Sequence, residues 1–352
     1  MSQRRTAICI VDGEGAMVAE GSALTSPAEI HLWIVKHIDV ALVQRVGLEA
    51  GPMSFWLHSE LAAMELPVIC LEAFQAAQLL KVQRNKTDRN DARGLAQIVR
   101  LGGHFLRSVA IRRSSSQELR ALLTLRQYLV SQKVGLQNNI TGVLKQFGLV
   151  VRRGKLSAET FREGVLMTLS AAHERGVFLR EMIGPALALL DGIVEQLAVL
   201  TRQVQEAARA DAVCRRLMTV PGVGPIVALS YMTAVDDPQR FARASDVGAY
   251  FGLTPRQYQS GEIDIRGNAS RRGDIMTRCH LIQAATVLLA STKKWSTLRA
   301  WGMRVAKKSG MGKARIAVAR KLSTILWLMW VREQDFCWST GSDDPPTLAT
   351  AA

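Results

Sequence analysis

The sequence predicts an α/β domain followed by predominantly helical regions. Three observations support this fold class: strand and helix signals alternate in the first part of the chain, leucines recur at helical spacing after Ser116, and helical signal dominates again from Ala212. A chain of 352 residues, of which 48% are hydrophobic, can bury more than one core. The expected divisions are residues 1–112, 113–208 and 209–333, followed by a tail of disordered composition, 334–352.

The first region opens with a β-rich run that ends in a turn at residues 12–15, after which a second strand can return as its hairpin partner. A hairpin followed by alternating strands and helices indicates an α/β domain with a mixed sheet. Strands are expected over Ala7–Val11, Ala16–Gly21, Gln44–Leu48 and Pro67–Leu71, and helices over Ser26–Val35, Pro52–Met64, Ala73–Leu80 and Asp88–Leu101.

Apolar residues recur at coiled-coil spacing in two stretches of the central region. The first stretch contains Leu122, Leu129, Leu136 and Val143, and the second runs from Leu190 to Val204. Because a basic, irregular connection at 151–156 separates them, the two stretches predict an antiparallel coiled-coil arm or a dimer seam. An ordinary helical bundle explains the same pattern, since each run is short.

The third region is expected to be mostly helical and contains Pro-Gly-Val-Gly-Pro at residues 221–225. This segment resembles the turn of a helix-hairpin-helix, in which Gly222 and Gly224 let backbone N–H groups approach a DNA phosphate. An ordinary turn between helices is the alternative. The region ends in a stretch rich in lysine and arginine from Lys293 to Lys321.

The overall charge is strongly basic. A net charge of +15 and a pI near 10.1 favour a polyanionic partner, with nucleic acid ahead of an anionic membrane surface. No uninterrupted apolar stretch reaches the roughly 20 residues of a membrane span, and the N-terminus is unlike a signal peptide. We therefore expect a cytoplasmic protein without a membrane partner. Five scattered cysteines favour neither structural zinc nor a disulfide framework.

Three acidic side chains are candidate metal ligands. Glu49 follows an expected strand, where a side chain can project beyond a sheet, and Asp88 and Asp91 share one face of an expected helix. Hard divalent cations such as Mg²⁺ select oxygen ligands of this kind, and two-metal phosphoryl transfer needs several of them. The alternative is that the aspartates favour the helix dipole, with Thr87 as the N-cap, as acidic residues in a first turn commonly do.

Ser260 precedes a glycine in an expected loop that is rich in arginine. This setting can hold a phosphodiester while the hydroxyl attacks phosphorus. Phosphate binding by the arginines without serine catalysis is the alternative. The histidines are dispersed, so a Ser-His-Asp triad has little support. The arginines are Arg256, Arg266, Arg271 and Arg272.

Taken together, these segments resemble the DEDD transposases of the IS110 insertion-sequence family. The matching segments are Gly-Leu-Glu-Ala around Glu49, Asn-Lys-Thr-Asp-Arg-Asn-Asp-Ala at 85–92, Pro-Gly-Val-Gly, and Gly-Leu-Thr-Pro-Arg followed by Ser-Gly. The resemblance covers nearly the whole chain. It implies a RuvC-like domain of ribonuclease H architecture, a coiled-coil region for assembly, and a mostly helical C-terminal transposase domain with a helix-hairpin-helix-like turn.

The resemblance also implies roles for individual residues. The three acidic residues correspond to the second, third and fourth members of a catalytic Mg²⁺ site, and Ser260 corresponds to the nucleophile that becomes linked to a DNA end. Lys86 and Arg89 are expected to contact nucleic acid. A structured bridge RNA guides members of the family, and homodimers pair into a tetramer.

The family's first aspartate has no counterpart in the sequence. It lies on an opening strand in a Gly-Ile/Leu-Asp-Val-Ser type of segment, and Met1 falls where the valine would stand. Asp12 cannot easily replace it, because it lies in the hairpin turn that follows. We expect a start assigned too late, so that the aspartate and the central strand of the sheet precede Met1. An in-frame stop upstream, with no Asp codon, would contradict this and indicate a decayed copy.

Three functions fit the sequence. The leading one is an RNA-guided, Mg²⁺-dependent DNA recombinase that uses Ser260. A metal-only nuclease resembling a Holliday-junction resolvase would still cleave DNA after Ser260→Ala. A non-catalytic nucleic-acid-binding protein would bind in a salt-sensitive manner and cleave nothing.

Overall fold

The computed structural model describes residues 4–81, 85–102, 108–151, 157–174, 177–261 and 263–338, except for the side chain of Arg266. The expected basic connection, apart from residue 151, and most of the expected disordered tail, residues 339–352, lie outside the described residues. The chain divides into two compact units, Met1–Arg112 (unit 1) and Arg113–Ala352 (unit 2), and each unit is described by itself.

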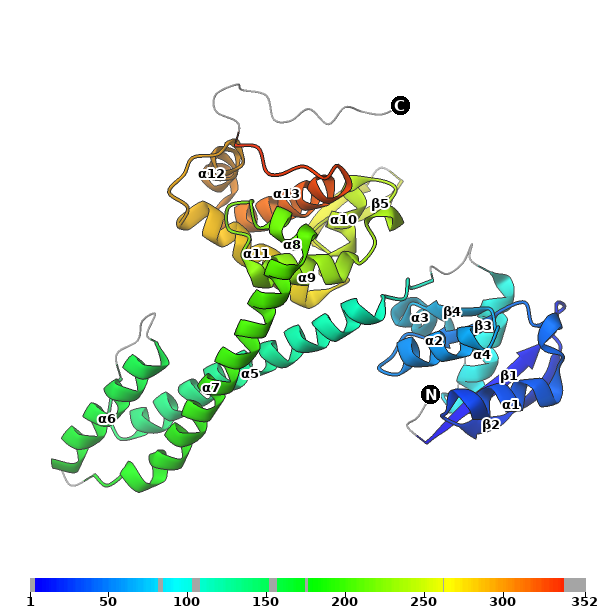
Figure 1. Cartoon of the computed structure of the whole chain (residues 1–352), viewed down its shortest axis with the longest axis horizontal. Coiled ribbons are helices and arrows are strands. Elements are labelled where there is room, and N and C mark those ends of the chain that lie inside the picture. The colour runs from blue at the N-terminus through cyan, green and yellow to red at the C-terminus, as the bar shows by residue number, and fades with distance from the viewer. Residues whose placement is uncertain are drawn as a thin grey trace. The chain divides into compact units, whose positions relative to one another are not determined.

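Unit 1 combines paired strands with helices, coloured blue to cyan in Figure 1. Its elements are β1 (Arg5–Val11), β2 (Met17–Leu24), α1 (Pro27–His37), η1 (Val40–Leu42), β3 (Val46–Glu49), α2 (Ser54–Ala63), β4 (Val68–Leu71), α3 (Ala73–Leu80) and α4 (Asp88–Leu101). β1 and β2 form an antiparallel hairpin, whereas β3 and β4 are parallel. The strands and helices expected from the sequence are therefore confirmed, with slightly different ends.

The expected mixed sheet is wrong for the residues that the structure describes. The β1–β2 pair and the β3–β4 pair are not hydrogen-bonded to each other. Instead α4 contacts both β1 and β3, so a helix joins the two pairs.

The core of unit 1 lies mainly beneath α1 and α2. Leu57 and Leu61 of α2 are completely buried there. A smaller cluster holds α4 against the parallel pair, and in it Val99 packs directly on Gly47 of β3. A Cβ atom at Gly47 would lie only 2.1 Å from Cγ2 of Val99, so the close approach of α4 to β3 requires glycine at this position.

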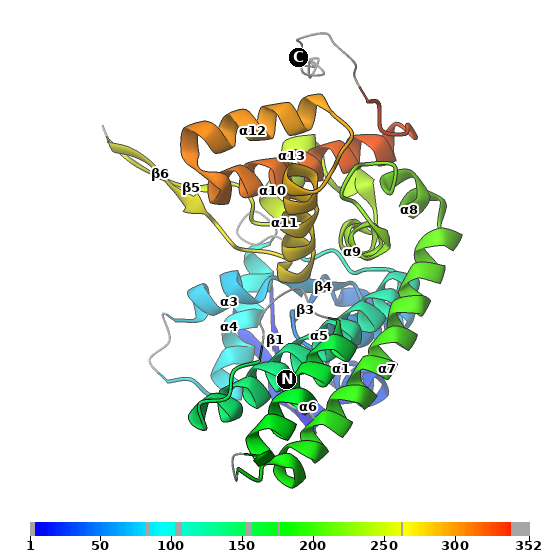
Figure 2. The same ribbon diagram turned by 90° about the vertical axis from the view of Figure 1, so that its left-hand side faces the viewer.

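Unit 2 is a helical body with a helical arm and a β-hairpin, β5–β6 (Figure 2). Its elements are α5 (Ser114–Gln146), α6 (Ala158–Glu174), α7 (Arg180–Ala210), α8 (Ala212–Leu217), α9 (Pro225–Val235), η2 (Pro238–Arg240), α10 (Ala244–Tyr250), β5 (Pro255–Ser260), β6 (Ile263–Ala269), α11 (Ile275–Ala290), α12 (Thr297–Ser309) and α13 (Met311–Val331).

The arm consists of α5 and α7 packed antiparallel, with α6 at its far end. Ile140, near the end of α5, shares a core with Leu187, near the start of α7. At the other end of the arm, Leu123 and Val204 join the core of the helical body. The predicted antiparallel pairing is therefore present within one chain. Coiled-coil packing, a dimer seam and a domain boundary after residue 208 remain predictions.

One helix passes a test that the sequence analysis did not anticipate. α7 is long and apolar enough, with a mean hydropathy of 1.6 over its best window, to cross a membrane by length and composition alone. A single such helix is weak evidence, because helices of soluble proteins pass the same test. In the structure α7 packs against α5 and α6 as one side of the arm, with 17% of its apolar window buried.

The helical body is built around α9, which is buried from Val227 to Val235. A helix that is apolar on every face belongs at the centre of a domain, and α5, α7 and α11 surround this one. Just beyond it, Asp236 accepts hydrogen bonds from Ser116 Oγ at 2.6 Å and from the Arg113 backbone N–H at 3.0 Å. Burial alone would raise the pKa of Asp236, but these hydrogen bonds and the charge of Arg113 outweigh it and lower the pKa.

Candidate active site

The predicted acidic residues lie at the ends of two elements of unit 1. Glu49 is the last residue of β3 and is half-buried. Asp88 and Asp91 lie in the first turn of α4, where Asp88 is exposed and Asp91 is half-buried. The Thr87 hydroxyl accepts the Asn90 backbone N–H at 3.1 Å, which confirms the predicted N-cap.

The metal cluster expected from the sequence is not assembled in the described part of the chain. No three Asp, Glu, His or Cys side chains gather there closely enough to hold a metal ion. Glu49 belongs to a strand end, whereas Asp88 and Asp91 belong to the start of a helix, where both favour the helix dipole. The structure therefore does not bring these three carboxylates into one metal-holding group, and their role as Mg²⁺ ligands remains a prediction.

Glu20 of β2 anchors the helix that carries the two aspartates, and the sequence analysis did not single it out. Its carboxylate pairs with Arg89 and also with Arg93, whose Nη2 lies 3.0 Å from Oε2. The hydrogen bond from Arg93 is the largest cause of a lowered pKa at Glu20. The i, i+4 spacing of the two arginines on an expected helix was the available signal for a shared acidic partner.

The same face of α4 continues the contact with the β1–β2 hairpin. Gln97 Nε2 donates to the Gly15 carbonyl at 2.7 Å, and Arg100 Nη1 donates to the Gly13 carbonyl at 3.2 Å. Arg89, expected to contact nucleic acid, is thus engaged by Glu20, although its side chain remains 67% exposed. Lys86 is exposed, and its predicted contact with nucleic acid is untested.

Ser260 lies at the tip of the β5–β6 hairpin and not in the open loop that the sequence suggested. It is the last residue of β5, pairs with Ile263 across the tip, and is exposed. Gly261, which follows, adopts a φ of +57°. The sequence analysis missed these strands, although Tyr258 and the Ile-x-Ile alternation from Ile263 to Ile265 supplied a period-two signal.

The base of the hairpin is a tight crossing of two chain segments. Gly252 and Gly273 both adopt positive φ, +66° and +87°. A Cβ on Gly252 would lie 2.0 Å from the Arg272 carbonyl oxygen, and one on Gly273 would lie 1.9 Å from the Tyr250 carbonyl oxygen. Buried Arg278 ties the crossing together, because its Nη1 donates to the carbonyls of Phe251 and Arg272, each at 3.2 Å.

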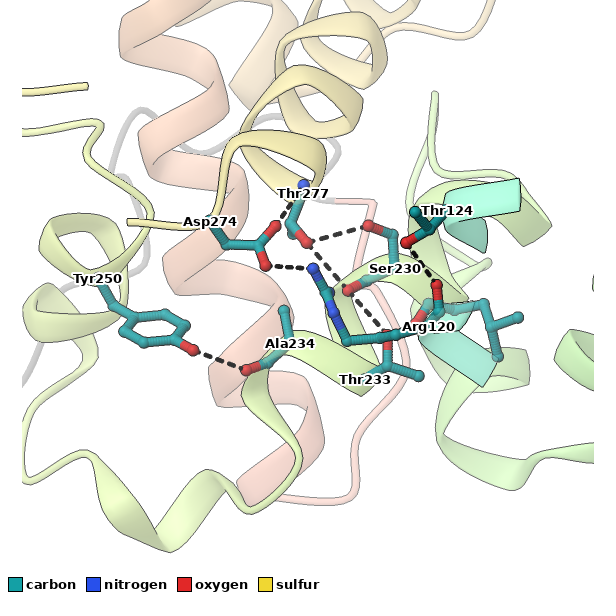
Figure 3. A network of polar contacts seen from close by, with 9 residues as sticks. Arg120, Thr124, Ser230, Thr233, Ala234, Tyr250, Asp274 and Thr277 are labelled. Atoms are coloured by element: carbon teal, nitrogen blue, oxygen red, sulfur yellow. Dashed lines mark hydrogen bonds and ion pairs between the residues drawn. The ribbon is translucent and has the colours of Figure 1, made fainter. Parts of the chain in front are cut away.

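Asp274, directly after this crossing, connects the hairpin to the arm. It accepts the Thr277 backbone N–H at 2.8 Å as the N-cap of α11 and forms an ion pair with Arg120 of α5. Figure 3 shows this arrangement, with Thr277 continuing to Ser230 of α9 through a contact of 3.0 Å. The side chains of Arg120 and Asp274 are only 16% and 9% exposed, so the pair lies largely out of water.

The predicted phosphate-binding arginines lie near this base. Arg256, Arg271 and Arg272 are exposed, and the side chain of Arg266 lies outside the described residues. Arg256 Nη2 is 3.3 Å from the Ser270 carbonyl, and Arg271 adopts an unusual φ of +56°. The structure thus brings arginines to the hairpin base, several residues from Ser260 at its tip.

The glycine turn before α9 has a structural explanation at one of its two positions. A Cβ on Gly222, where φ is +87°, would lie 2.5 Å from the Ala284 carbonyl oxygen of α11. Close packing inside the body therefore requires this glycine. Gly224 is the N-cap residue of α9, and nothing lies within 4 Å of where its Cβ would be. The predicted approach of either glycine to DNA is untested.

Comparison with known proteins gives a consistent result. Residues 1–148 match the model DEDD_Tnp_IS110, described as "Transposase", and residues 214–300 match the model "Transposase IS116/IS110/IS902 family". The chain is 30% identical over 257 residues to the transposase for insertion sequence element IS1111A of Coxiella burnetii, covering 72% of this chain and 69% of that protein. It is also 30% identical over 272 residues to a probable family 20 transposase of Pseudomonas aeruginosa, covering 76% and 78% respectively.

Proposed function

The chain belongs to the IS116/IS110/IS902 family of insertion-sequence transposases, whose substrate is DNA, and we propose that it cuts and rejoins DNA strands with Ser260 as the nucleophile. The observation that supports this role is the position of Ser260. It lies at the exposed tip of a hairpin whose base carries exposed arginines, so a DNA backbone can reach its hydroxyl.

In the proposed step the Ser260 hydroxyl attacks a backbone phosphorus. A bond forms between Oγ and phosphorus, one phosphorus–oxygen bond of the strand breaks, and the released deoxyribose oxygen takes up a proton while the serine loses one. In this intermediate the strand end stays attached to Ser260 through its phosphate. The hydroxyl of a second strand end can then attack the same phosphorus, release the serine and be joined. Arg256, Arg271 and Arg272 would offset charge on the phosphate or on its neighbours along the strand.

An acidic site in unit 1 is the second part of the proposal. Glu49, Asp88 and Asp91 would act in catalysis and contribute to Mg²⁺ binding, as DEDD-type family membership suggests. By themselves these residues do not form a metal-holding group among the described residues. Glu20 supports this part of the proposal, because its ion pairs with Arg89 and Arg93 fix the orientation of α4, which carries the aspartates.

Guidance by a bridge RNA and assembly of homodimers into a tetramer, in the cytoplasm and without a membrane, complete the proposal. The net charge of +15 supports nucleic-acid partners in general, whether DNA or RNA. The nucleic-acid contacts proposed at Lys86, Arg89, Gly222 and Gly224 belong to the same hypothesis.

A covalent-adduct assay tests the proposal. The full chain is incubated with Mg²⁺, the RNA encoded by the element, and labelled DNA of the element ends, and the products are separated under denaturing conditions. We expect a protein–DNA adduct with the wild type, and none with Ser260→Ala, which should still bind DNA. Ser170→Ala, which alters an exposed serine of α6, serves as a variant expected to keep the adduct. Strand cleavage by Ser260→Ala would instead identify a metal-only nuclease.

One observation favours a second function. The lack of a three-residue metal group among the described residues fits a non-catalytic nucleic-acid-binding protein derived from a transposase. Such a protein would bind DNA with a strong dependence on salt but would neither cleave strands nor form an adduct in the same assay.

A further inference from the structure

The C-terminal helices carry an unusually one-sided charge. Between Asp274 and Glu333 the chain contains twelve lysines and arginines and no aspartate or glutamate. In the whole chain, by contrast, 45 basic residues are accompanied by 30 acidic ones. Except at its two ends, beside Asp274 and Glu333, basic side chains in this interval therefore have no acidic neighbour in sequence that could offset their charge.

Within this interval, exposed cations occur on both sides of the turn that connects α12 and α13, in the second half of α12 and the first turns of α13. Arg304, Lys307 and Lys308 share one face of α12, because they are spaced i, i+3, i+4. Lys313 and Arg315 follow in the first turns of α13, on different sides of that helix because they are two residues apart, and all five side chains are exposed. We call these five residues the α12–α13 basic face. In Figure 2, α12 lies alongside α13.

Nothing in the described structure uses these charges. None of the five side chains forms an ion pair with a carboxylate among the described residues. By contrast, Lys321, further along α13, lies over the ring of Trp301, with Nζ 5.1 Å from the ring centroid. Exposed cations on neighbouring turns of a helix repel one another, and this cost is offset when a polyanion binds.

The start of α13 adds donors for an anion. Gly310 is its N-cap residue, has a φ of +84°, and supplies no side-chain hydrogen bond to the first turn, in which Met311, Gly312 and Lys313 are all exposed. The N–H groups of a helix's first turn have no partner within the helix, and the helix dipole favours negative charge there. A phosphate can thus meet N–H groups and lysine side chains at one place.

We propose that the α12–α13 basic face binds the backbone of double-stranded DNA, independently of sequence. Most of α12 and all of α13 lie beyond residues 1–148 and 214–300, the two segments that match the family models. The face is also separate in sequence from Ser260 and from the arginines of the hairpin base. The proposal rests on the DNA substrate of the family and not on the role proposed for Ser260.

Duplex DNA fits this face better than single-stranded nucleic acid. Single strands are usually held by exposed aromatic rings on which bases stack, in addition to positive charge. Trp301 of α12 is half-buried with Lys321 over its ring, and the exposed Trp295 precedes α12, at the opposite end of that helix from the connecting turn. Cations spread along helices match regularly spaced phosphates instead.

Equilibrium binding of the full chain to a random-sequence DNA duplex of about 30 base pairs, measured across salt concentrations, tests the proposal. The variant Lys307→Gln/Lys308→Gln/Lys313→Gln should bind on the order of 100-fold more weakly near 0.1 M salt, with a salt slope shallower by about 2 to 3, because each lost phosphate contact removes about 0.9 from that slope. Replacing the same lysines by arginine should preserve binding.

A matched control removes the same charge elsewhere in unit 2. Lys145→Gln/Arg202→Gln/Arg209→Gln alters three exposed residues of the arm and should change the affinity less than tenfold, a factor given as a rough bound. Equal losses in both triple variants would overturn the proposal, because net charge alone would then explain binding. Unchanged binding by the lysine variant would overturn it as well.

Two further measurements separate this proposal from RNA binding and from the serine chemistry proposed above. A duplex RNA of the same length distinguishes the source of the phosphates: a loss of RNA binding with unchanged DNA binding would overturn the DNA assignment. Ser260→Ala should bind the DNA duplex like the wild type. If it binds normally but no adduct forms even with the wild type, the proposed serine chemistry fails and the basic face still stands.

Discussion

The β5–β6 hairpin has a base and a tip that are held in opposite ways. At the base, the backbone at two glycines lies so close to opposing carbonyl oxygens that a Cβ atom would not fit. Arg278 and the Asp274–Arg120 pair tie this crossing of the chain to α11 and α5. At the tip, Ser260 is exposed, and nothing lies within 4 Å of where a Cβ on Gly261 would be. Protein atoms therefore specify the conformation of the base and leave that of the tip open.

This difference indicates which contacts position the proposed nucleophile, Ser260. A catalytic hydroxyl must be placed accurately relative to phosphorus for the reaction to be fast. The base can fix the direction in which the hairpin leaves the body, but residues 255–260 of β5 are exposed throughout. We therefore expect contacts with bound DNA to fix the final position of Ser260. Changes at the base should lower stability strongly, whereas changes at the tip should lower stability less and reduce activity.

The largest expected effect comes from adding a methyl group at the base. Gly252→Ala should lower the free energy of unfolding of unit 2 by at least about 4 kcal/mol, because it combines a positive φ with a Cβ 2.0 Å from a carbonyl oxygen. Gly261→Ala, with a similar φ and open space, should cost only about 1 to 2 kcal/mol. Urea unfolding of both variants measures the difference, and equal losses would show that the base is not specified by close packing.

Breaking the ion pair behind the base should have the next largest effect. Asp274→Asn leaves the largely buried Arg120 guanidinium without its carboxylate, and we expect a loss of about 3 kcal/mol in the free energy of unfolding. The matched change is Asp191→Asn, which breaks an exposed pair with Arg162 in the arm and should cost less than about 1 kcal/mol. Chemical denaturation at neutral pH tests both, and an Asp274→Asn loss as small as that of Asp191→Asn would contradict the anchoring role.

A smaller, pH-dependent effect comes from His280 of α11. Its burial, and secondarily the charge of Arg126, lowers its pKa from 6.5 to about 4. Because the folded state resists protonation and the unfolded chain does not, stability is fully present above pH 6.5 and is lost as pH falls toward 4. The loss should reach about 2 kcal/mol near pH 5. Unfolding measured against pH should show it in the wild type and not in His280→Gln; the same slope in both would contradict it.

The smallest effect on stability is expected at the tip. Tyr258 and Ile265 pair across the hairpin but are 64% and 58% exposed, so replacing either by alanine should change the free energy of unfolding by no more than about 0.5 kcal/mol. The same variants should reduce adduct formation, since they alter the surface that carries Ser260 toward DNA. Thermal unfolding and the adduct assay together test this, and unchanged adduct formation would show that the strand surface has no part in the reaction.

Local patterns were enough to predict most elements of unit 1 and the long helices of unit 2. Thr87 as an N-cap, α3 and α4 with their bounds, and the β1–β2 hairpin all follow from capping and periodicity. The break between the two strand pairs did not follow, because hydrogen bonding between strands depends on which neighbours are present and not on the pattern of any single strand.

The contacts that support the candidate site residues could not be predicted from the sequence. Glu20 and Arg120 acquire their roles through partners 73 and 154 residues away, so no local motif contains both members of either pair. The hairpin was missed because its apolar side chains remain exposed, whereas sequence patterns are usually interpreted in terms of burial. The exposure of Ser260 could likewise be known only from the structure.

Mapping the covalent attachment site tests the central claim most directly. The adduct formed on element-end DNA is digested with protease and nuclease, and the nucleotide-bearing peptide is identified by mass spectrometry. We predict that the modified residue is Ser260, at the hairpin tip. Attachment to any other residue, or strand joining without an adduct when the reaction is stopped before completion, would contradict the assignment of the nucleophile.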